Sequence, residues 1–499
     1  METRSSHRWW ILVVLCLSSL VLVVDGMALT VAVPQMARDI GATAQDTQWI
    51  LDSYILVFAG LLLTSGSLGD RFGRRKVMII GLLLFGAASL AAVFVTSPAV
   101  MIAVRVAMGA GGALIMPSTL SILIVVFDQE ERRTAMAVWT SVAMLGLVGS
   151  PVLGGVLIAR FSWHAIFFIN IPVVVLAILA GLILMPESKG PWHKPDLPGA
   201  VLSAVGMVAL VWWIIGIPRH GAVSGTAAIP LAVALVALGG FVYWENVTSE
   251  PMVPLVLFKH RNFTGGSLSL ALVEIANGGL LLVFTQYLQF VLGYSPVKAG
   301  LAFVPLAVGA LAGNMAGVKL GAKTGPRYLV LGGMLVMAAS FGLLTTVSAD
   351  TGFALPAIAL GLLGLGAGVA MPAAVGALMS TIPPEQAGVG SALNDTIQQA
   401  GSALGIAILG SLLAGGFTRH MPAGAPAQAR QSITGALAAA PGDTGLVHVA
   451  REAYTASMSA TFTVSAIAIL AAALLATLVL RNPKPAPTPA PAQAPELVA

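Results

Sequence analysis

The stretch Gly66-Ser67-Leu68-Gly69-Asp70-Arg71-Phe72-Gly73-Arg74-Arg75-Lys76 joins two apolar runs that are each long enough to cross a lipid bilayer. Lys and Arg beside a membrane-spanning helix resist translocation, so we expect this loop on the cytoplasmic side. Its glycines permit a tight turn, and Asp70 can face a helix N-terminus, where the helix dipole favours an anion. The simpler interpretation is a cationic anchor without further function, but a degraded copy of the pattern occurs later in the chain.

The composition supports a protein that crosses a membrane many times. Of its 499 residues, 57% are hydrophobic and only 9% are charged, and the mean hydropathy is +0.92. Soluble proteins carry about 25% charged residues. The net charge of +5 reflects cations in loops, so we expect no nucleic-acid partner. The single cysteine, Cys16, excludes an internal disulfide. The first apolar run carries Asp25 and has no clear cleavage site, which indicates a retained helix.

Fourteen apolar runs of about 20 residues predict fourteen transmembrane helices, because backbone that faces lipid must satisfy its own hydrogen bonds. The fold class is therefore an all-α integral membrane protein. The runs are 10–33, 48–68, 76–96, 99–121, 134–158, 165–185, 197–217, 226–246, 264–291, 299–319, 328–348, 353–373, 386–413 and 455–480.

The distribution of Lys and Arg predicts the orientation. With the N-terminus inside, the inner segments hold seventeen of these residues and the outer segments seven, while Arg105 lies within a helix. Cytoplasmic segments of membrane proteins are enriched in cations. Both termini are therefore predicted to be cytoplasmic.

An internal repeat predicts two related halves. Gly109-Ala-Gly111 leads to Met116-Pro117, and Gly364-Leu-Gly366 leads to Met371-Pro372 at an offset of 255. The opening loop has a weaker copy at 320–327, at an offset of 252. These offsets predict a six-helix half at 1–190, two inserted helices at 191–250, and a second half at 251–480 with a long outer loop at 414–454. Residues 481–499 form a Pro/Ala-rich tail that we expect to be disordered.

Four acids and one base lie within the apolar runs, where a charged side chain is costly and is a functional candidate. They are Asp25, Asp52, Glu274, Asp395 and Arg105. Asp25 is one candidate partner for Arg105, and Asp52 is near enough to a helix end to face outer water. Each acid could instead be purely structural. Arg105 is the one base against Asp25, Glu274 and Asp395, so at least two of these three acids are expected to be protonated or neutralised by a cation. Met27, Phe284, Tyr287 and Phe290 could hold the organic part of such a cation, although packing explains each equally well.

The fifth apolar run carries small residues four apart, at Gly146, Ser150 and Gly154, followed by Gly155. Such a stripe permits close helix packing, and Pro151 can kink the helix. We found no nucleotide-binding loop, since Ala322 stands where the Gly before Lys323-Thr324 is needed. Seven scattered His and one Cys form no obvious metal site. The sequence thus predicts a protein that is not an enzyme and uses neither a cofactor nor a metal.

Several of these stretches resemble motifs of the major facilitator superfamily. The opening loop is similar to its loop 2–3 signature, which implies a gate on the cytoplasmic side formed by Gly66, Asp70, Arg71, Gly73, Arg74 and Arg75. The stretch around Asp25 resembles, in part, the helix 1 motif of the drug:proton antiporters. The Arg105 stretch resembles the helix 4 motif linked to proton coupling. The stretch from Gly146 to Gly155 resembles the antiporter motif, with Ser150 in place of a glycine.

Other stretches resemble the fourteen-helix, EmrB/QacA-type branch. They are 163–172, where His164 replaces the usual Arg, Asp196-Leu-Pro-Gly199, and Gly293-Tyr294-Ser295-Pro296-Val297-Lys298-Ala299-Gly300. The resemblance implies two six-helix halves with two inserted helices between them.

The resemblance also implies a function. It is proton-driven export of lipophilic, often cationic drugs or antiseptics across a bacterial plasma membrane, by a chain that acts as a monomer in the lipid bilayer. One alternative is the same machinery exporting a metabolite or a self-made antibiotic. Another is a non-transporting membrane receptor, against which the intramembrane acids and the helix 5 stripe argue.

Overall fold

The computed structural model describes residues 7–189, 196–222, 224–249, 251–349, 351–382, 387–439 and 444–481. Within these ranges every regular element is a helix and there is no strand. The expected disordered tail lies, from residue 482 onwards, outside the described residues.

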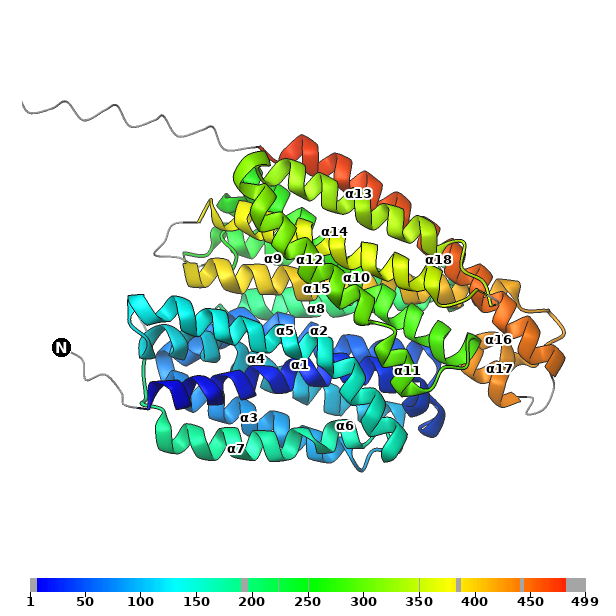
Figure 1. The fold of residues 1–499 in the computed structure, drawn as a ribbon, viewed down its shortest axis with the longest axis horizontal. Helices are drawn as coiled ribbons and strands as arrows, with labels where there is room; N and C mark the ends of the chain where they lie inside the picture. Colours follow the sequence, from blue (N-terminus) through cyan, green and yellow to red (C-terminus); the bar gives the residue numbers. More distant parts are fainter. Residues whose placement is uncertain are drawn as a thin grey trace, which may run out of the picture.

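Figure 1 shows the helices of the N-terminal part stacked against those of the C-terminal part. The N-terminal group comprises α1 (Arg8–Asp39), α2 (Ala44–Phe72), α3 (Arg74–Ala92), α4 (Pro98–Val126), α5 (Gln129–Arg160), α6 (Ala165–Phe168) and α7 (Asn170–Leu184). Two helices follow, α8 (Leu197–His220) and α9 (Gly225–Val247). The C-terminal group comprises η1 (Leu255–Lys259), α10 (Arg261–Gln286), η2 (Tyr287–Val291), α11 (Pro296–Leu301), α12 (Val304–Thr324), α13 (Pro326–Leu344), α14 (Ala354–Met379), α15 (Ala387–His420), α16 (Ala427–Gln431), α17 (Ile433–Ala439) and α18 (Thr444–Val479).

The described helices include twelve that are long and apolar enough to cross a membrane. A thirteenth span arises if α2, which bends by 53° after Leu62, is counted as one crossing. The stretch Ser65-Gly66-Ser67 beyond the bend is of the kind at which helices kink. The remaining expected run, 134–158, falls within α5, several of whose side chains lie outside the description. The predicted count of fourteen is therefore not confirmed.

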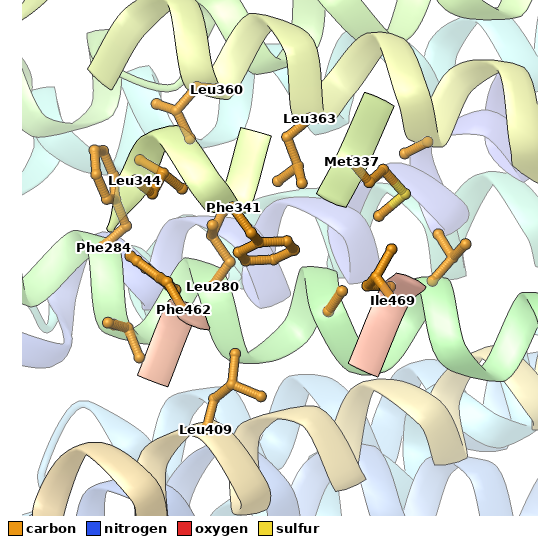
Figure 2. Close-up of a cluster of buried hydrophobic side chains, with 14 of the residues drawn as sticks. Leu280, Phe284, Met337, Phe341, Leu344, Leu360, Leu363, Leu409, Phe462 and Ile469 are labelled. Carbon is orange, nitrogen blue, oxygen red and sulfur yellow. The ribbon is translucent and has the colours of Figure 1, made fainter. Parts of the chain in front are cut away.

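Two separate buried clusters form the interior. One is built almost entirely from residues 11–185 and the other from residues 257–480, and we refer to these as the first and second halves. Figure 2 shows the second cluster, in which Phe341, Leu363 and Phe462 from three helices interdigitate with Leu280. A small third cluster joins Leu56 of α2 to α8 and α15, so the inserted helix contacts both halves.

The glycine contacts of α4 and α14 confirm that the two halves repeat one another. A Cβ atom on Gly109 would meet the carbonyl oxygen of Tyr54, and one on Gly364 would meet that of Leu306. Gly111 likewise lies against the Gly81 carbonyl, and Gly366 against the Gly333 carbonyl. Each pair of contacted residues differs by 252 in sequence, which is the offset that relates the two loops. The glycine spacing therefore encodes the same close three-helix packing twice.

The segment 414–454 is largely helical, and this corrects the expectation of a long loop. α15 continues to His420, α16 and α17 follow, and α18 begins at Thr444. An apolar run marks only the part of a helix inside the bilayer, whereas helices can extend beyond it with polar residues. The described chain begins and ends at one end of the molecule, and α16 and α17 lie at the other (Figure 1).

Candidate functional site

Asp25 and Arg105 form an ion pair deep inside the first half. Arg105 Nη1 lies 2.6 Å from Asp25 Oδ2, and their side chains are 2% and 0% exposed. α1 and α4 supply the two groups, so the partner that the sequence suggested for Arg105 is the one that the structure shows. The two charges neutralise each other, and Asp25 is therefore not an unpaired acid.

Three further groups hold this pair, and the sequence analysis identified none of them as a partner. Arg105 Nε donates to the Ile50 carbonyl oxygen at 3.3 Å, and the guanidinium lies 4.2 Å from the centre of the Tyr54 ring. Asn170 Nδ2 donates to Asp25 Oδ1 at 3.1 Å. Asn170 lies in the 163–172 motif, but neither that motif nor the position of Tyr54 near a helix end indicated a partner, because neighbours between helices are set by packing.

The second half carries no equivalent pair. Gly154 of α5 lies against Ala28, and Leu409 of α15, 255 residues later, lies against Gly279. α1 and α10 are thus related by an offset of 251, which places Ala276 where the first half has Asp25. The offset of 255 places Leu360 where the first half has Arg105. The ion pair is therefore a feature of one half only.

Asp52 is fully buried on α2, so the expectation that it could face outer water is wrong. Its side chain is 0% exposed, and among the described residues neither carboxyl oxygen has a hydrogen-bond partner. One helical turn to either side, Gln48 contacts α15 and Leu56 packs against α8 and α15. Asp52 therefore lies where α2 meets the second half and the inserted helix.

Glu274 and Asp395 lie on α10 and α15, which pack closely together. Both are only partly buried, and no described Lys, Arg or His forms an ion pair with either. Asp395 Oδ1 accepts a hydrogen bond from Asn394 at 2.9 Å. Glu274 lies beside Gly401, six residues after Asp395. Along the axis of α15, the point at which Glu274 packs is therefore about 9 Å from Asp395.

The Gly66–Lys76 segment, expected as a loop, is helical on both sides of Gly73, since Gly66–Phe72 ends α2 and Arg74–Lys76 begins α3. Contacts on both sides of Gly73 hold this turn. Arg74 Nη2 lies 2.8 Å from Asp70 Oδ1, one helical turn away. Glu187, just after α7, accepts a hydrogen bond from the backbone N–H of Arg75 at 3.1 Å. Gly73 has a φ of 114°, and a Cβ atom there would lie 2.6 Å from the Glu187 carboxyl carbon. Both the turn and the close approach require glycine, and the sequence analysis did not identify Glu187.

The small residues of α5 serve two contacts. On one side, Gly146 and Gly154 bring α5 against Leu20 and Ala28 of α1. On the other side, a Cβ atom on Gly155 would lie 2.6 Å from the Pro296 carbonyl oxygen of α11. The Ser150 hydroxyl donates to the Gly146 carbonyl within α5, so the replacement of glycine by serine is tolerated without a buried unpaired group.

The contact between α5 and α11 is one of several contacts that join the two halves at the end away from Gly66–Lys76. We call this set of contacts the seam. Gln289 Nε2 donates to the Val31 carbonyl oxygen at 2.9 Å, and Arg38 lies over the Phe290 ring at 5.0 Å. Gln48 Nε2 lies 3.4 Å from the Ile406 carbonyl oxygen. The hydrogen bonds between the halves that the structure describes all lie at the end away from the Gly66–Lys76 loop. The described structure is thus joined at one end.

Packing explains three of the four proposed organic-cation residues, whereas Met27 on α1 is partly exposed. Phe284 and Tyr287 are 0% exposed in the second core, and the Tyr287 hydroxyl donates to the Ser348 carbonyl oxygen at 2.8 Å. Phe290 belongs to the seam. At the same end, Trp163 donates to Asp39 and stacks on His164, and burial lowers the pKa of the His164 imidazole. Across the part of the chain that the structure describes, no three His, Cys, Asp or Glu residues gather as a metal site.

Comparison with known proteins identifies the family. A sequence profile of the Major Facilitator Superfamily matches residues 15–406. The chain belongs to this superfamily and is a multi-pass membrane transporter of small molecules rather than an enzyme. Its fold is similar to that of a bacterial homologue of the human lysosomal transporter Spinster, in an inward-facing and unoccupied conformation. The TM-score is 0.70, the identity is 18%, and the match covers 97% of this chain and 100% of the other.

Its characterised relatives are drug and antibiotic transporters. The chain is 34% identical to the multidrug efflux pump LfrA of Mycolicibacterium smegmatis, over 94% of this chain and 96% of the relative. It is 34% identical to the methyl viologen resistance protein SmvA of Salmonella typhimurium, over 85% and 86%. It is 35% identical to the cephamycin export protein CmcT of Amycolatopsis lactamdurans, over 82% and 85%.

Proposed function

We propose that this protein exports lipophilic, cationic drugs or antiseptics in exchange for protons across the bacterial plasma membrane, acting as a monomer with both termini in the cytoplasm. The proposal rests on a difference between the intramembrane acids in whether each has a basic partner. Asp25 is neutralised by Arg105, whereas Glu274 and Asp395 have no such partner among the described residues. An unpaired carboxylate at that depth must take up a proton or a cation.

Glu274 and Asp395 form the exchange site in this proposal. The distance of about 9 Å along α15 between Asp395 and the point at which Glu274 packs leaves room for an organic cation. Protons arriving from outside neutralise the acids and release the cation, and loss of these protons to the cytoplasm restores the negative charge. Asp25 and Arg105 then have a different role, in which the paired charges fix the relative positions of α1, α2, α4 and α7. Asp52 is a further proton-binding site, which becomes accessible when α2 separates from α15.

The loop from Gly66 to Lys76 acts as the cytoplasmic gate. The seam lies at the opposite end, so the described structure corresponds to the inward-facing state if the loop is cytoplasmic. For transport to proceed, the seam must open and the loop must close against the second half. The helix 5 contact of Gly155 with α11 is the part of the seam that the antiporter motif supplies.

The test is ethidium efflux from energised cells that lack other pumps, with and without a protonophore. We expect the protonophore to stop efflux by the wild-type protein. Glu274→Gln and Asp395→Asn should reduce export of cationic compounds, and Thr396→Val serves as a control beside Asp395. Efflux that continues after the proton gradient collapses would exclude proton coupling. Unchanged export of cations by both acid variants would remove these acids from the mechanism.

The second candidate function, export of a metabolite or a self-made antibiotic, is favoured by the name of one relative, a cephamycin export protein. The two functions share the same machinery and differ in cargo. A growth-inhibition panel in an efflux-deficient host separates them. Protection against many unrelated cationic compounds supports multidrug export, and protection against a single compound class supports dedicated export.

A further inference from the structure

Two carboxyl groups that have no role in the transport proposal lie close together where α8 begins and α9 ends. Asp196 immediately precedes α8, and Glu245 lies in the last turn of α9. Glu245 is 4% exposed. Gly199 lies beside both groups: a Cβ atom there would lie 2.7 Å from Glu245 Oε1 and in contact with Asp196 Oδ2. The two oxygens therefore flank the same point, and the motif Asp196-Leu-Pro-Gly199 needs its glycine to let them approach.

One oxygen of each carboxyl group is already occupied by donors. Asp196 Oδ1 accepts from the Gly199 backbone N–H at 2.9 Å and from Trp244 Nε1 at 2.7 Å. Glu245 Oε2 accepts from the Val253 backbone N–H at 2.9 Å. The facing oxygens, Asp196 Oδ2 and Glu245 Oε1, are buried and have no donor among the described residues. Each carboxyl group thus presents its unsatisfied oxygen to the other.

Two facing carboxylates in a buried place repel each other and cannot both stay ionised without compensation. Neither Asp196 nor Glu245 forms an ion pair with a Lys, Arg or His of the described chain. Lys189 lies on the preceding segment, and Lys259 and His260 lie on and just after η1, exposed to solvent. Residues 190–195, which include His193 and Lys194, lie outside the described residues.

We propose that Asp196 and Glu245 form a proton-binding site. One proton shared between Asp196 Oδ2 and Glu245 Oε1 holds the start of α8 and the end of α9 together. The shared proton turns a repulsive contact into a strong, charge-assisted hydrogen bond. Through the Val253 N–H, the site also ties the pair to the segment that leads into α10. The site therefore connects the start of α8 and the end of α9 to the segment that precedes α10.

The pH dependence follows from proton linkage. The folded pair holds a proton that the separated carboxyl groups of an unfolded chain release at lower pH, so the folded state binds more protons. Its stabilisation is present at low pH and is lost as the pH rises and the shared proton leaves. Glu245→Gln removes this dependence, because its amide nitrogen donates permanently to Asp196 Oδ2 and its oxygen still accepts from Val253.

The experiment measures the unfolding temperature of the purified full-length protein in detergent between about pH 5 and pH 9, a range that brackets a shared carboxyl proton. We expect the unfolding temperature of the wild type to fall by a few degrees more than that of Glu245→Gln as the pH rises, because the other buried acids are common to both proteins. Glu452→Gln, which changes an exposed acid of α18, should behave as the wild type does. If Glu245→Gln fails to fold, Asp196→Asn supplies the same permanent donor from the other side.

Difference infrared spectra between low and high pH give a second readout. The wild type and Glu452→Gln should show the carbonyl band of a protonated buried carboxyl group, and Glu245→Gln should lose one component of it. Identical pH profiles for the wild type and Glu245→Gln would overturn the proposal. So would restoration of the wild-type stability at high pH by sodium, potassium, magnesium or calcium ions, since a cation would then occupy the site.

Discussion

At the scale of single residues, the ion pair of Asp25 and Arg105 can be separated into a structural and a functional contribution. Removing one partner leaves a buried charge alone, so Asp25→Ala should lower the free energy of unfolding by about 3–5 kcal/mol. The double variant Asp25→Ala/Arg105→Leu should regain most of this stability, because it reproduces the residues that the second half carries at the equivalent positions, Ala276 and Leu360.

Ethidium efflux by the same double variant tests the functional part. We expect the double variant to fold but to transport poorly, because the ion pair that fixes the relative positions of α1, α2, α4 and α7 is gone. Thermal unfolding and efflux are measured on the same preparations. A double variant that is stable and transports normally would show that the pair has only a structural role.

Asp70 is a second residue whose role the structure limits. Its contact with Arg74 is partly exposed, and such pairs contribute about 0–1 kcal/mol to stability. Asp70→Asn should therefore leave insertion and unfolding temperature almost unchanged while transport falls, because Ala322 occupies the repeated position and offers no replacement charge. Efflux is compared at equal protein level. Normal efflux would show that the Gly66–Lys76 segment serves only as a cationic anchor.

At the scale of elements, the stripe on α5 predicts two very different outcomes for similar substitutions. A side chain at Gly155 must displace the α11 backbone at Pro296 and Val297, and overpacking of this kind costs about 1–3 kcal/mol. Gly155→Leu should thus shift the equilibrium away from the joined seam by about 5- to 150-fold.

Gly149→Leu is the matched control on the same helix, because nothing lies within 4 Å of a Cβ atom there. We expect it to transport normally. Accessibility of a cysteine at position 289 to a thiol reagent added outside reports the state of the seam. Equal accessibility in the Gly155→Leu and Gly149→Leu proteins would contradict the assignment of this contact to the seam.

At the scale of the whole molecule, alternating access predicts that the seam must separate during each cycle. Gln48 and Gly410 are in contact across it. In a Cys16→Ser background, cysteines at 48 and 410 joined by a short thiol cross-linker should abolish efflux, and reduction or cleavage of the linker should restore it. Each single-cysteine variant treated in the same way is the control. Full efflux from the cross-linked protein would mean that this end does not open.

The orientation in the membrane is the second prediction at this scale. Ser188, just after α7, lies at the same end as the Gly66–Lys76 loop, since its carbonyl oxygen accepts a hydrogen bond from the Arg74 N–H at 2.9 Å. The charge distribution predicts that this end is cytoplasmic. A cysteine at position 188 in the Cys16→Ser background should react with a membrane-impermeant reagent only after the cells are opened. Reaction in intact cells would reverse the proposed topology.

The sequence could predict the fold to the extent that its signals are local. Apolar length predicted the positions of the twelve spans that the described helices show, but not the count of fourteen. The glycine pattern at an offset of 255 predicted a repeat, and the contacts of Gly109 and Gly364 follow it. Helix ends were less accurate, because α15 and α18 continue past their apolar runs. The candidate acids were found by their cost inside a bilayer, and Arg105 was suggested as a partner of Asp25, but Asn170 and the burial of Asp52 were not predicted.

The sequence by itself determined that this chain crosses a membrane many times, repeats a helical half and carries acids within it, because hydrophobic length, charge and glycine spacing are properties of neighbouring residues. The tertiary structure alone decided that Asp25 is neutralised while Glu274 is not, that Asp52 is buried, and that Glu187 packs against the turn at Gly73. The contacts of Asp25 reach 80 residues to Arg105 and 145 residues to Asn170. Partners at such separations are chosen by the rotation and tilt of packed helices, which no local spacing encodes.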